Sequence, residues 1–167
     1  MKNNNNILII NTGGTFNKQY NEFNGSLLIK KNNDLIKDIL DKSKIYNMEV
    51  KGILYKDSLD ITLEDRKLLV KFINQSKYKK IIIIHGTDTM DQTALFLEEN
   101  IKEKEIILTG AMVPYSINKV EAVANLMMGY GYLLSNHKNG IWISMHGMVK
   151  KNENIKKNRE LGVFECQ

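Results

Sequence analysis

Short apolar runs alternate with amphipathic segments along the whole chain. The four consecutive isoleucines at residues 81–84 are typical of a strand that is buried on both faces of a sheet. Similar runs predict five strands, at residues 7–10, 48–55, 81–84, 106–108 and 141–144. Apolar residues at helical spacing between these runs predict helices at residues 33–42, from residue 62 onward, 90–100 and 118–134.

The alternation of strands and helices predicts an α/β fold. We expect a doubly wound, mainly parallel sheet with helices on both faces, Rossmann-like or flavodoxin-like, whose strands are joined by right-handed crossovers. The chain has 167 residues, with no internal repeat and no low-complexity linker. This length and uniformity predict a single domain over residues 1–167.

The isoleucine run ends at Gly86, and a helix-compatible segment follows at once. Thr89 and Gln92 have the spacing of a capping box, which marks the start of a helix. Thr87 and Asp88 therefore lie between the carboxyl end of a buried strand and a helix N-terminus, where open α/β sheets bind their ligands. A hydroxyl and a carboxylate at this position form either a catalytic or substrate-binding pair, or only a helix cap.

Polar loops follow four of the predicted strands, at residues 12–15, 57–60, 87–88 and 109. Gly13 and Gly14 in the first loop allow a tight turn and a close approach to a ligand. The carboxyl ends of parallel strands meet at one edge of a sheet, so these loops should converge, which favours an active site. Residues 16–30 have no clean periodicity and form either a mobile flap over the glycine turn or a surface hairpin.

Composition narrows the range of partners. The net charge is +5, but the lysines are scattered, and no basic stripe is interleaved with aromatic residues, so we expect no nucleic-acid partner. No apolar run approaches the ~20 residues that a membrane helix needs, so we expect no membrane partner. The single cysteine, Cys166, cannot form an internal disulfide, and the first residues lack the apolar stretch of a signal peptide. These features predict a cytoplasmic protein.

The polar residues at the predicted sheet edge suit acyl transfer. A threonine hydroxyl is a weak nucleophile until a base takes its proton, and a lysine held by a carboxylate can be that base. The backbone N–H groups of the glycine turn are expected to form an oxyanion hole. No dinucleotide or phosphate-loop signature occurs, and the histidines lack metal-ligand spacing, so we expect no cofactor and no metal. We expect His85 and His146 to be structural.

Five short motifs carry a family resemblance. In chain order they are Thr12-Gly13-Gly14-Thr15, Lys56-Asp57-Ser58-Leu59-Asp60, His85-Gly86-Thr87-Asp88-Thr89-Met90, Thr109-Gly110-Ala111-Met112-Val113-Pro114 and Lys157-Asn158-Arg159. On these motifs the sequence resembles the bacterial-type L-asparaginase/glutaminase family, most closely its short single-domain members. The resemblance covers nearly the whole chain and implies that the family's smaller C-terminal domain, which completes substrate recognition in two-domain members, is absent from residues 1–167.

The resemblance also implies catalytic roles. Thr15 would be the nucleophile that forms an acyl-enzyme, and Thr87, with Asp88 and a lysine, would activate the attacking group or the water. Which threonine attacks first stays open. The lysine is Lys157 or Lys156, and Lys157 fits the hydrophobic-x-Lys pattern of the family better.

The resemblance implies a flap residue and a set of substrate contacts as well. Tyr20 would be the flap tyrosine that orients the nucleophile. Leu59 departs from the family, because two-domain members usually carry at its position a glutamine that binds the carboxylate of the substrate. The implied substrate-binding residues are Gly14, Ser58, Leu59, Thr87 and Asp88.

The implied function is an amidohydrolase that converts L-asparagine, or a related small amide, to aspartate and ammonia. Two other classes stay open, namely a non-catalytic amino-acid-binding module and an ammonia-releasing subunit of an amidotransferase. Retention of both threonines and of Asp88 favours the enzyme. The helix predicted at residues 118–134 carries apolar residues that either cover the sheet or form a surface for a homodimer or homotetramer. These residues are Met127, Met128, Tyr130 and Tyr132.

Overall fold

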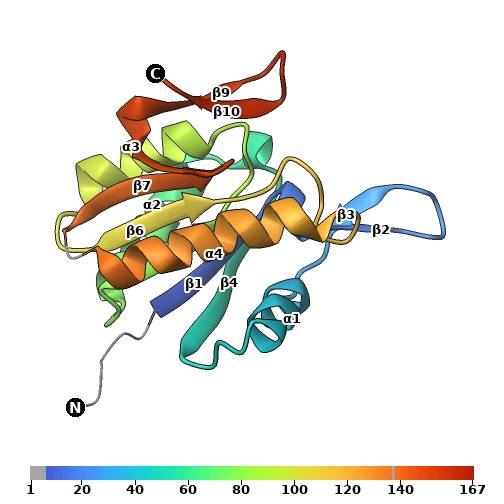
Figure 1. The fold of residues 1–167 in the computed structure, drawn as a ribbon, viewed down its shortest axis with the longest axis horizontal. Helices are drawn as coiled ribbons and strands as arrows, with labels where there is room; N and C mark the ends of the chain where they lie inside the picture. Colours follow the sequence, from blue (N-terminus) through green and yellow to red (C-terminus); the bar gives the residue numbers. More distant parts are fainter. Residues whose placement is uncertain (1–6, 137) are drawn as a thin grey trace.

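Six strands form the central sheet, in the order β4-β1-β5-β6-β7-β8 (Figure 1). The computed structural model describes residues 7–136 and 138–167. The strands are β1 (Ile7–Gly13), β2 (Lys18–Tyr20), β3 (Leu27–Ile29), β4 (Met48–Lys56), β5 (Lys80–Ile84), β6 (Glu105–Thr109), β7 (Gly140–Met145), β8 (Met148–Lys151), β9 (Ile155–Asn158) and β10 (Val163–Cys166). The helices are η1 (Thr15–Asn17), α1 (Asp34–Lys42), η2 (Ser58–Asp60), α2 (Leu63–Gln75), α3 (Met90–Asn100), α4 (Lys119–Ser135) and η3 (Asn152–Asn154).

All five predicted strands are present and pair in parallel, whereas β8 joins the sheet antiparallel. Numbered in chain order, the parallel strands lie in the spatial order 2-1-3-4-5, which is the flavodoxin-like arrangement. The predicted fold class is therefore confirmed. From β1 the chain crosses to β4 on one side, and from β5 it crosses to β6 on the other side. The switch point of the sheet therefore lies between the neighbouring strands β1 and β5. Ligands of open α/β sheets bind beyond the carboxyl ends of the strands at such a point.

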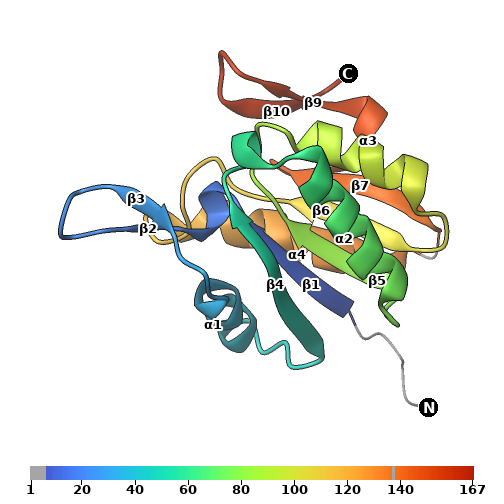
Figure 2. The ribbon, with the colours of Figure 1, turned by 180° about the vertical axis from the view of Figure 1, so that it is seen from behind.

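Both faces of the sheet are covered by helices. Helices α1 and α4 lie on the face that is toward the viewer in Figure 1, and α2 and α3 lie on the face that is toward the viewer in Figure 2. Ile7 and Ile9 of β1 belong to the core with α1 and α4, whereas Leu8 and Ile10 belong to the core with α2 and α3. Burial on both faces explains why these strands have continuous rather than alternating apolar sequences.

The crossover through α4 differs in hand from the others. The connections through α2 and α3 move across the sheet toward β7 on one face, but the connection through α4 continues in that direction on the opposite face. The connection through α1 lies on the same face as α4 but moves across the sheet in the opposite direction, from β1 to β4. It therefore has the same hand as the connections through α2 and α3. The expectation of right-handed crossovers throughout is therefore wrong, because the β6-α4-β7 unit is left-handed.

The left-handed crossover leaves the α3 side of β7 without a following helix. A hairpin of β9 and β10 lies there instead, above α3 in Figure 1. Ile155 and Phe164 from this hairpin are 2% and 6% exposed and join the core of the α2 and α3 face. The position of α4 on the other face thus provides the space that the C-terminal hairpin occupies.

The predicted helix starts are correct, but one predicted cap is wrong. Thr62 and Asp65 form a reciprocal capping box at the start of α2. Thr89 precedes α3 as expected, yet its side chain makes no cap hydrogen bond. Its hydroxyl donates to the carbonyl oxygen of Ser58 at 2.7 Å instead, because η2 packs against the start of α3. Thr89 therefore ties two loops of the site together rather than capping its own helix.

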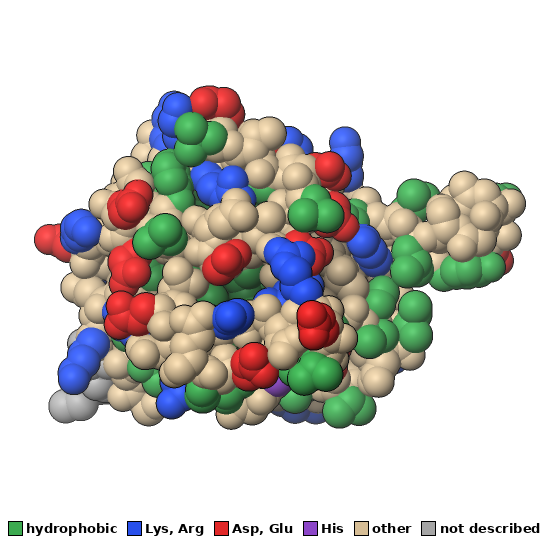
Figure 3. All heavy atoms as spheres, turned by 90° about the horizontal axis from the view of Figure 1, so that it is seen from above, with side chains coloured by type: hydrophobic (Ala, Val, Ile, Leu, Met, Phe, Trp, Pro, Cys, Tyr) green, Lys and Arg blue, Asp and Glu red, His purple; other side chains and the backbone are tan. Residues whose placement is uncertain are grey.

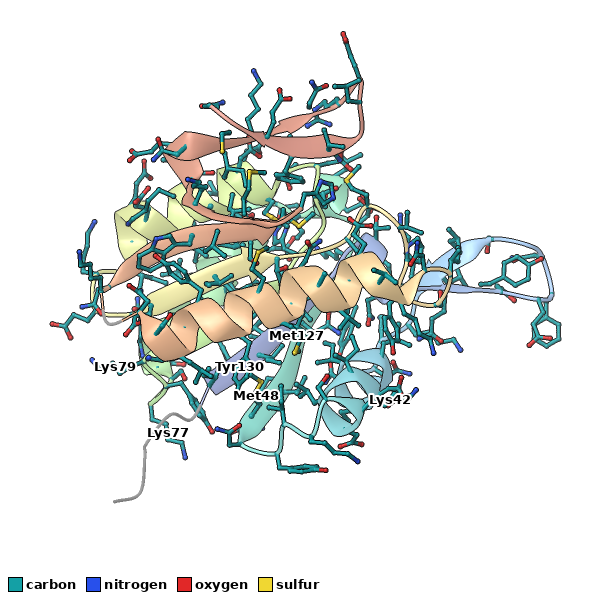
Figure 4. All side chains as sticks on the ribbon, viewed as in Figure 1. Lys42, Met48, Lys77, Lys79, Met127 and Tyr130 are labelled. Atoms are coloured by element: carbon teal, nitrogen blue, oxygen red, sulfur yellow. The ribbon has the colours of Figure 1, made fainter. Side chains whose placement is uncertain are left out.

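Helix α4 packs over the sheet with much of its apolar surface. Met127 and Tyr130 project from α4 toward Met48 of β4 (Figure 4), and all of them pack partly buried against the α1 and α4 core. Tyr132 packs on Trp142, with a distance of 5.5 Å between the ring centroids. These contacts bury much of Met127, Tyr130 and Tyr132, three of the four residues of α4 that were considered for a partner surface. Among the described residues, no helix is long and apolar enough to cross a membrane.

Candidate active site

Close glycine contacts bring the loops after β1, β4 and β5 together. Gly14 has φ 70° and ψ −175°, a conformation that is essentially restricted to glycine, and a Cβ atom there would lie 2.4 Å from the backbone nitrogen of Gly86. A Cβ atom at Gly86 would lie 2.6 Å from the Cβ of Ser58. The predicted convergence is therefore confirmed for these three loops, which contact one another at Gly14 and Gly86.

Substitution of Gly14 by alanine is expected to be strongly destabilising. The backbone strain and the collision with Gly86 should together lower the free energy of unfolding by about 3 kcal/mol or more. Gly131→Ala in α4 is the matched control, because no atom lies within 4 Å of the added Cβ and helix propensity should raise stability by up to about 1 kcal/mol. Chemical denaturation of both variants measures the difference. Equal stabilities would show that the loops move apart freely.

Lys157 joins Thr87 and Asp88 in a three-membered cluster. Its Nζ donates to Thr87 Oγ1 at 2.8 Å and to Asp88 Oδ1 at 2.8 Å. Thr87 is 5% exposed, and the Lys157 and Asp88 side chains are 14% and 31% exposed, so the ion pair is largely shielded from solvent. Such a cluster places an amine within proton-transfer distance of a hydroxyl and holds a carboxylate where it stabilises the protonated amine.

Strand alternation in β9 explains why Lys157 rather than Lys156 makes these contacts. Successive side chains of a strand point to opposite faces. Ile155 is buried in the core, so Lys157 shares its inward face and Lys156 is exposed on the other. The structure therefore favours Lys157, which the family pattern also favoured.

Arg159 is a residue of the site to which the sequence analysis assigned no role. Its Nη1 donates to Asp88 Oδ1 at 2.9 Å and its Nη2 donates to the Asp88 carbonyl oxygen at 2.8 Å. Arg159 lies in the turn directly after β9, and its place two residues after Lys157 in the same short motif was a usable signal. Asp88 therefore has two cationic partners.

Ser58 is brought to Asp88, whereas Leu59 is turned outward. Ser58 is 1% exposed, and its Oγ accepts a hydrogen bond from the Asp88 backbone N–H at 3.2 Å. Leu59 is 70% exposed. Asp57, which precedes them, caps η2 and pairs with Lys18 of β2 at 2.8 Å. Burial alone would raise the pKa of Asp57, but the hydrogen bonds from Lys18 and from the Leu59 N–H outweigh it and lower that pKa.

Thr15 and Tyr20 are placed on two different parts of the chain after β1. Thr15 is half-buried at the start of η1, directly after the Gly14 contact with Gly86. Tyr20 is 60% exposed on β2, in the hairpin that projects from the body in Figures 1 and 3, and its hydroxyl lies near Gly25. Among the described contacts, none joins Tyr20 to Thr15. Phe16 anchors η1 by stacking on Tyr115.

The expected oxyanion hole in the glycine turn is not formed by the glycines themselves. The Gly13 N–H donates to Asn11 Oδ1 at 2.9 Å, and the Gly14 N–H donates to the Lys56 carbonyl oxygen at 2.9 Å. The turn needs both hydrogen bonds to hold its shape, so neither donor is free for a ligand. The sequence-based interpretation is therefore wrong for these two donors.

His85 is buried and His146 is half-buried, and both support the loops and the hairpin around the site. His85 Nδ1 lies 2.7 Å from the Gly86 carbonyl oxygen, which can only accept, so Nδ1 carries the proton and Nε2 faces Thr93 Oγ1 at 2.9 Å. Burial lowers the pKa of His85 to about 4, so the ring is neutral near pH 7. His146 accepts from the Phe164 N–H at 3.0 Å and thereby holds the C-terminal hairpin.

A hollow of about 400 Å³ opens beside the lysine cluster, between the C-terminal hairpin and the start of α3. Its wall includes Thr87, Asp88, Lys157 and Arg159, together with Asn152 and Phe164. The Asn152 Oδ1 atom is buried and has no hydrogen-bond partner. Over the described residues, no group of three or more His, Cys, Asp or Glu side chains is placed to hold a metal ion.

Comparison with known proteins shows the family to which the chain belongs. The profile of the family described as "Asparaginase, N-terminal" matches residues 6–163. The chain belongs to the asparaginase family. A Haemophilus influenzae asparaginase-family protein, named as a probable periplasmic L-asparaginase, is 36% identical over 132 residues. This alignment covers 72% of the present chain and 36% of that protein.

Other asparaginase relatives cover more of the chain. The L-asparaginase of Thermococcus kodakarensis is 25% identical over 165 residues, which are 96% of this chain and 50% of that protein. The solved structure of the thermostable L-asparaginase from the same organism superposes with a TM-score of 0.81 at 26% identity, over 96% of this chain and 51% of that chain. This asparaginase-family chain therefore spans between about a third and a half of the length of these relatives.

Proposed function

We propose that this protein hydrolyses the amide of L-asparagine, or of a related small amide, to a carboxylate and ammonia through a threonine acyl-enzyme. The observation that carries the proposal is the position of the Lys157 Nζ, 2.8 Å from both Thr87 Oγ1 and Asp88 Oδ1. Membership of the asparaginase family supports the reaction type.

In the proposed reaction, a threonine hydroxyl attacks the amide carbon, and its proton passes to the departing nitrogen. The C–N bond breaks, ammonia leaves, and an ester joins the threonine to the acyl group. Water then attacks the ester, gives one proton back to the threonine oxygen and releases the acid. Lys157 would carry the proton from Thr87 Oγ1, and Asp88 would stabilise the ammonium that forms.

Thr15 and Thr87 divide the two hydroxyl roles in this proposal. Both follow a glycine at the contact between the β1 and β5 loops, on the switch point of the sheet. Thr15 would form the ester, and Tyr20 would orient it when the β2–β3 hairpin closes over the site. Gly14, Ser58 and Leu59 would contribute the remaining substrate contacts, although Ser58 is buried and Leu59 points outward in this structure.

The reaction is tested by measuring ammonia release from L-asparagine, L-glutamine and succinamate, the analogue of asparagine that lacks the α-amino group. We expect release from at least one of these amides and none from a Thr15→Ala, Thr87→Ala double variant. A folded protein that releases no ammonia but binds aspartate in calorimetry would support the amino-acid-binding module instead.

The proposal also includes a homodimer or homotetramer in the cytoplasm. The exposed thiol of Cys166 suits a reducing compartment, although the Haemophilus influenzae relative is named periplasmic. Sedimentation velocity of the purified protein reports the assembly state.

A further inference from the structure

We propose that Lys18 and Asp57 are positioning residues, whose ion pair links the strand that carries Tyr20 to the turn that carries Ser58. Through this pair the β2–β3 hairpin and η2 take their catalytic positions together. The inference rests on the proposed function, because it concerns how the proposed orienting residue and a proposed substrate contact are held relative to each other.

The ion pair joins two segments that are far apart in the sequence. Lys18 Nζ lies 2.8 Å from Asp57 Oδ2, and the two side chains are only 25% and 30% exposed. Partial removal from water strengthens the attraction between the charges relative to a fully exposed pair. Burial acts to raise the pKa of Asp57, but the hydrogen bonds from Lys18 and from the Leu59 N–H lower it, so the carboxylate is ionised near pH 7.

Asp57 connects this ion pair to the turn that carries Ser58. Its Oδ1 accepts a hydrogen bond from the Leu59 N–H at 3.3 Å, which caps the start of η2. Ser58 is the first residue of η2, and its Oγ and its carbonyl oxygen accept from the Asp88 N–H and the Thr89 hydroxyl. The orientation of the Asp57 carboxylate is therefore fixed by η2, which is itself held by the loop after β5.

Lys18 connects the same ion pair to Tyr20. Lys18 begins β2, and Tyr20 ends it two residues later. Side chains two residues apart in a strand lie on the same face, so the face of β2 that carries Lys18 also carries Tyr20. The Ser116 hydroxyl donates to the Lys18 carbonyl oxygen at 2.9 Å and holds the backbone at this point. The ion pair thus sets how the face of β2 that carries Tyr20 is oriented relative to η2.

The rest of the hairpin depends on this base for its position. Strands β2 and β3 form a separate two-stranded sheet that projects from the body (Figure 1), and such ribbons are only marginally stable alone. Tyr20 is 60% exposed, and Phe23 in the turn of the hairpin is 98% exposed. Among the described ion pairs, Lys18–Asp57 is the one that joins the hairpin to the rest of the protein. Its loss should therefore displace Tyr20 while leaving the core intact.

The experiment is a double-variant cycle measured by ammonia release. Lys18→Met keeps the apolar stem of the lysine, and Asp57→Asn keeps an oxygen that can cap η2, so each substitution removes mainly the charge. We expect each variant to lower kcat about tenfold, and the double variant to lower it by about the same factor, because both substitutions remove one interaction. Lys18→Arg can keep the ion pair and should stay within about twofold of wild type.

Two controls separate positioning from general support of the fold. Lys30→Met removes the same charge just after β3, where the exposed Lys30 side chain makes no ion pair among the described contacts, and it should leave kcat unchanged. In a Tyr20→Phe background, Lys18→Met should lower kcat by less than about twofold, because the pair acts through Tyr20. Additive losses in the double variant, no loss in the single variants, or an undiminished effect of Lys18→Met in the Tyr20→Phe background would each overturn the inference.

Hydrogen exchange tests the same coupling if the proposed hydrolysis fails. If no variant releases ammonia, the exchange of backbone amides in the β2–β3 hairpin and in η2 is compared between the wild type, Lys18→Met and Lys30→Met. We expect Lys18→Met to accelerate exchange in both segments and Lys30→Met in neither. Faster exchange in only one segment, or in neither, would show that the hairpin and η2 are not coupled by the pair, whatever the protein catalyses.

Discussion

Thr87→Ala is expected to lower kcat by at least about a thousandfold, which is the loss typical of a residue that acts in the chemical step. The variant removes the oxygen that faces Lys157 at 2.8 Å and leaves the lysine without a hydroxyl to deprotonate. Thr15→Ala should cause a loss of similar size, because the two hydroxyls act on the same acyl group. Single-turnover measurements with and without hydroxylamine as the acceptor would show which of the two steps each variant blocks.

Stability measurements separate chemistry from folding in these variants. The Thr15 side chain makes no hydrogen bond among the described contacts, and removal of the Thr87 hydroxyl should cost only about 1 kcal/mol. Unfolding temperatures should therefore change little. Thr15→Ser keeps a hydroxyl and should retain measurable activity. A Thr87→Ala protein with near-normal turnover would remove Thr87, and with it the Lys157 cluster, from the mechanism.

Lys157→Met should abolish activity, whereas Lys156→Met should leave it within a few-fold of wild type. The two substitutions remove the same charge from adjacent positions of β9, but only Lys157 reaches Thr87 and Asp88. Methionine keeps much of the length and apolar character of the lysine stem, so packing of the hairpin should be retained.

The fold of the Lys157→Met variant is protected by a second contact. Arg159 still pairs with Asp88 at 2.9 Å, so the Asp88 carboxylate is not left without a partner. Ammonia release and circular dichroism of both variants provide the comparison. Equal loss in both variants would indicate a general effect of hairpin charge, and a larger loss in Lys156→Met would identify the other lysine as the functional one.

The sequence predicted the parts of the fold that are determined by burial. Strands such as β5 are apolar throughout because both of their faces are covered, and this pattern needs no knowledge of the neighbours. Parallel strands end at one edge, so the meeting of Gly14 with Gly86 and of Ser58 with Asp88 followed from topology alone. The capping box of Thr62 and Asp65 at the start of α2 is equally local, because its two residues lie three positions apart.

Other features depended on contacts that local patterns do not encode. Helix α4 is apolar or small on much of its surface, so nothing in its periodicity specified which sheet face it would cover. In the structure, Gly129 lies so close to the sheet that an added Cβ atom would be 3.0 Å from Ile107 Cγ2, which identifies the side of α4 that faces the sheet. The β9–β10 hairpin was missed because its sequence is polar and lysine-rich, with Ile155 and Phe164 as its buried anchors. Arg159 was overlooked because neither β9 nor the turn that follows it was predicted.

The C-terminal hairpin carries Lys157, yet it pairs only with itself. Strands β9 and β10 form a separate two-stranded sheet, and such ribbons are only marginally stable alone. Its attachment includes the two apolar anchors, the His146 contact, the cluster around Asp88 and the contact of Cys166 with Met148. Detachment of the hairpin therefore requires much less free energy than unfolding of the six-stranded sheet. Backbone amides of β9 should exchange with deuterium earlier than those of β5, and on heating, catalysis should be lost before the sheet melts.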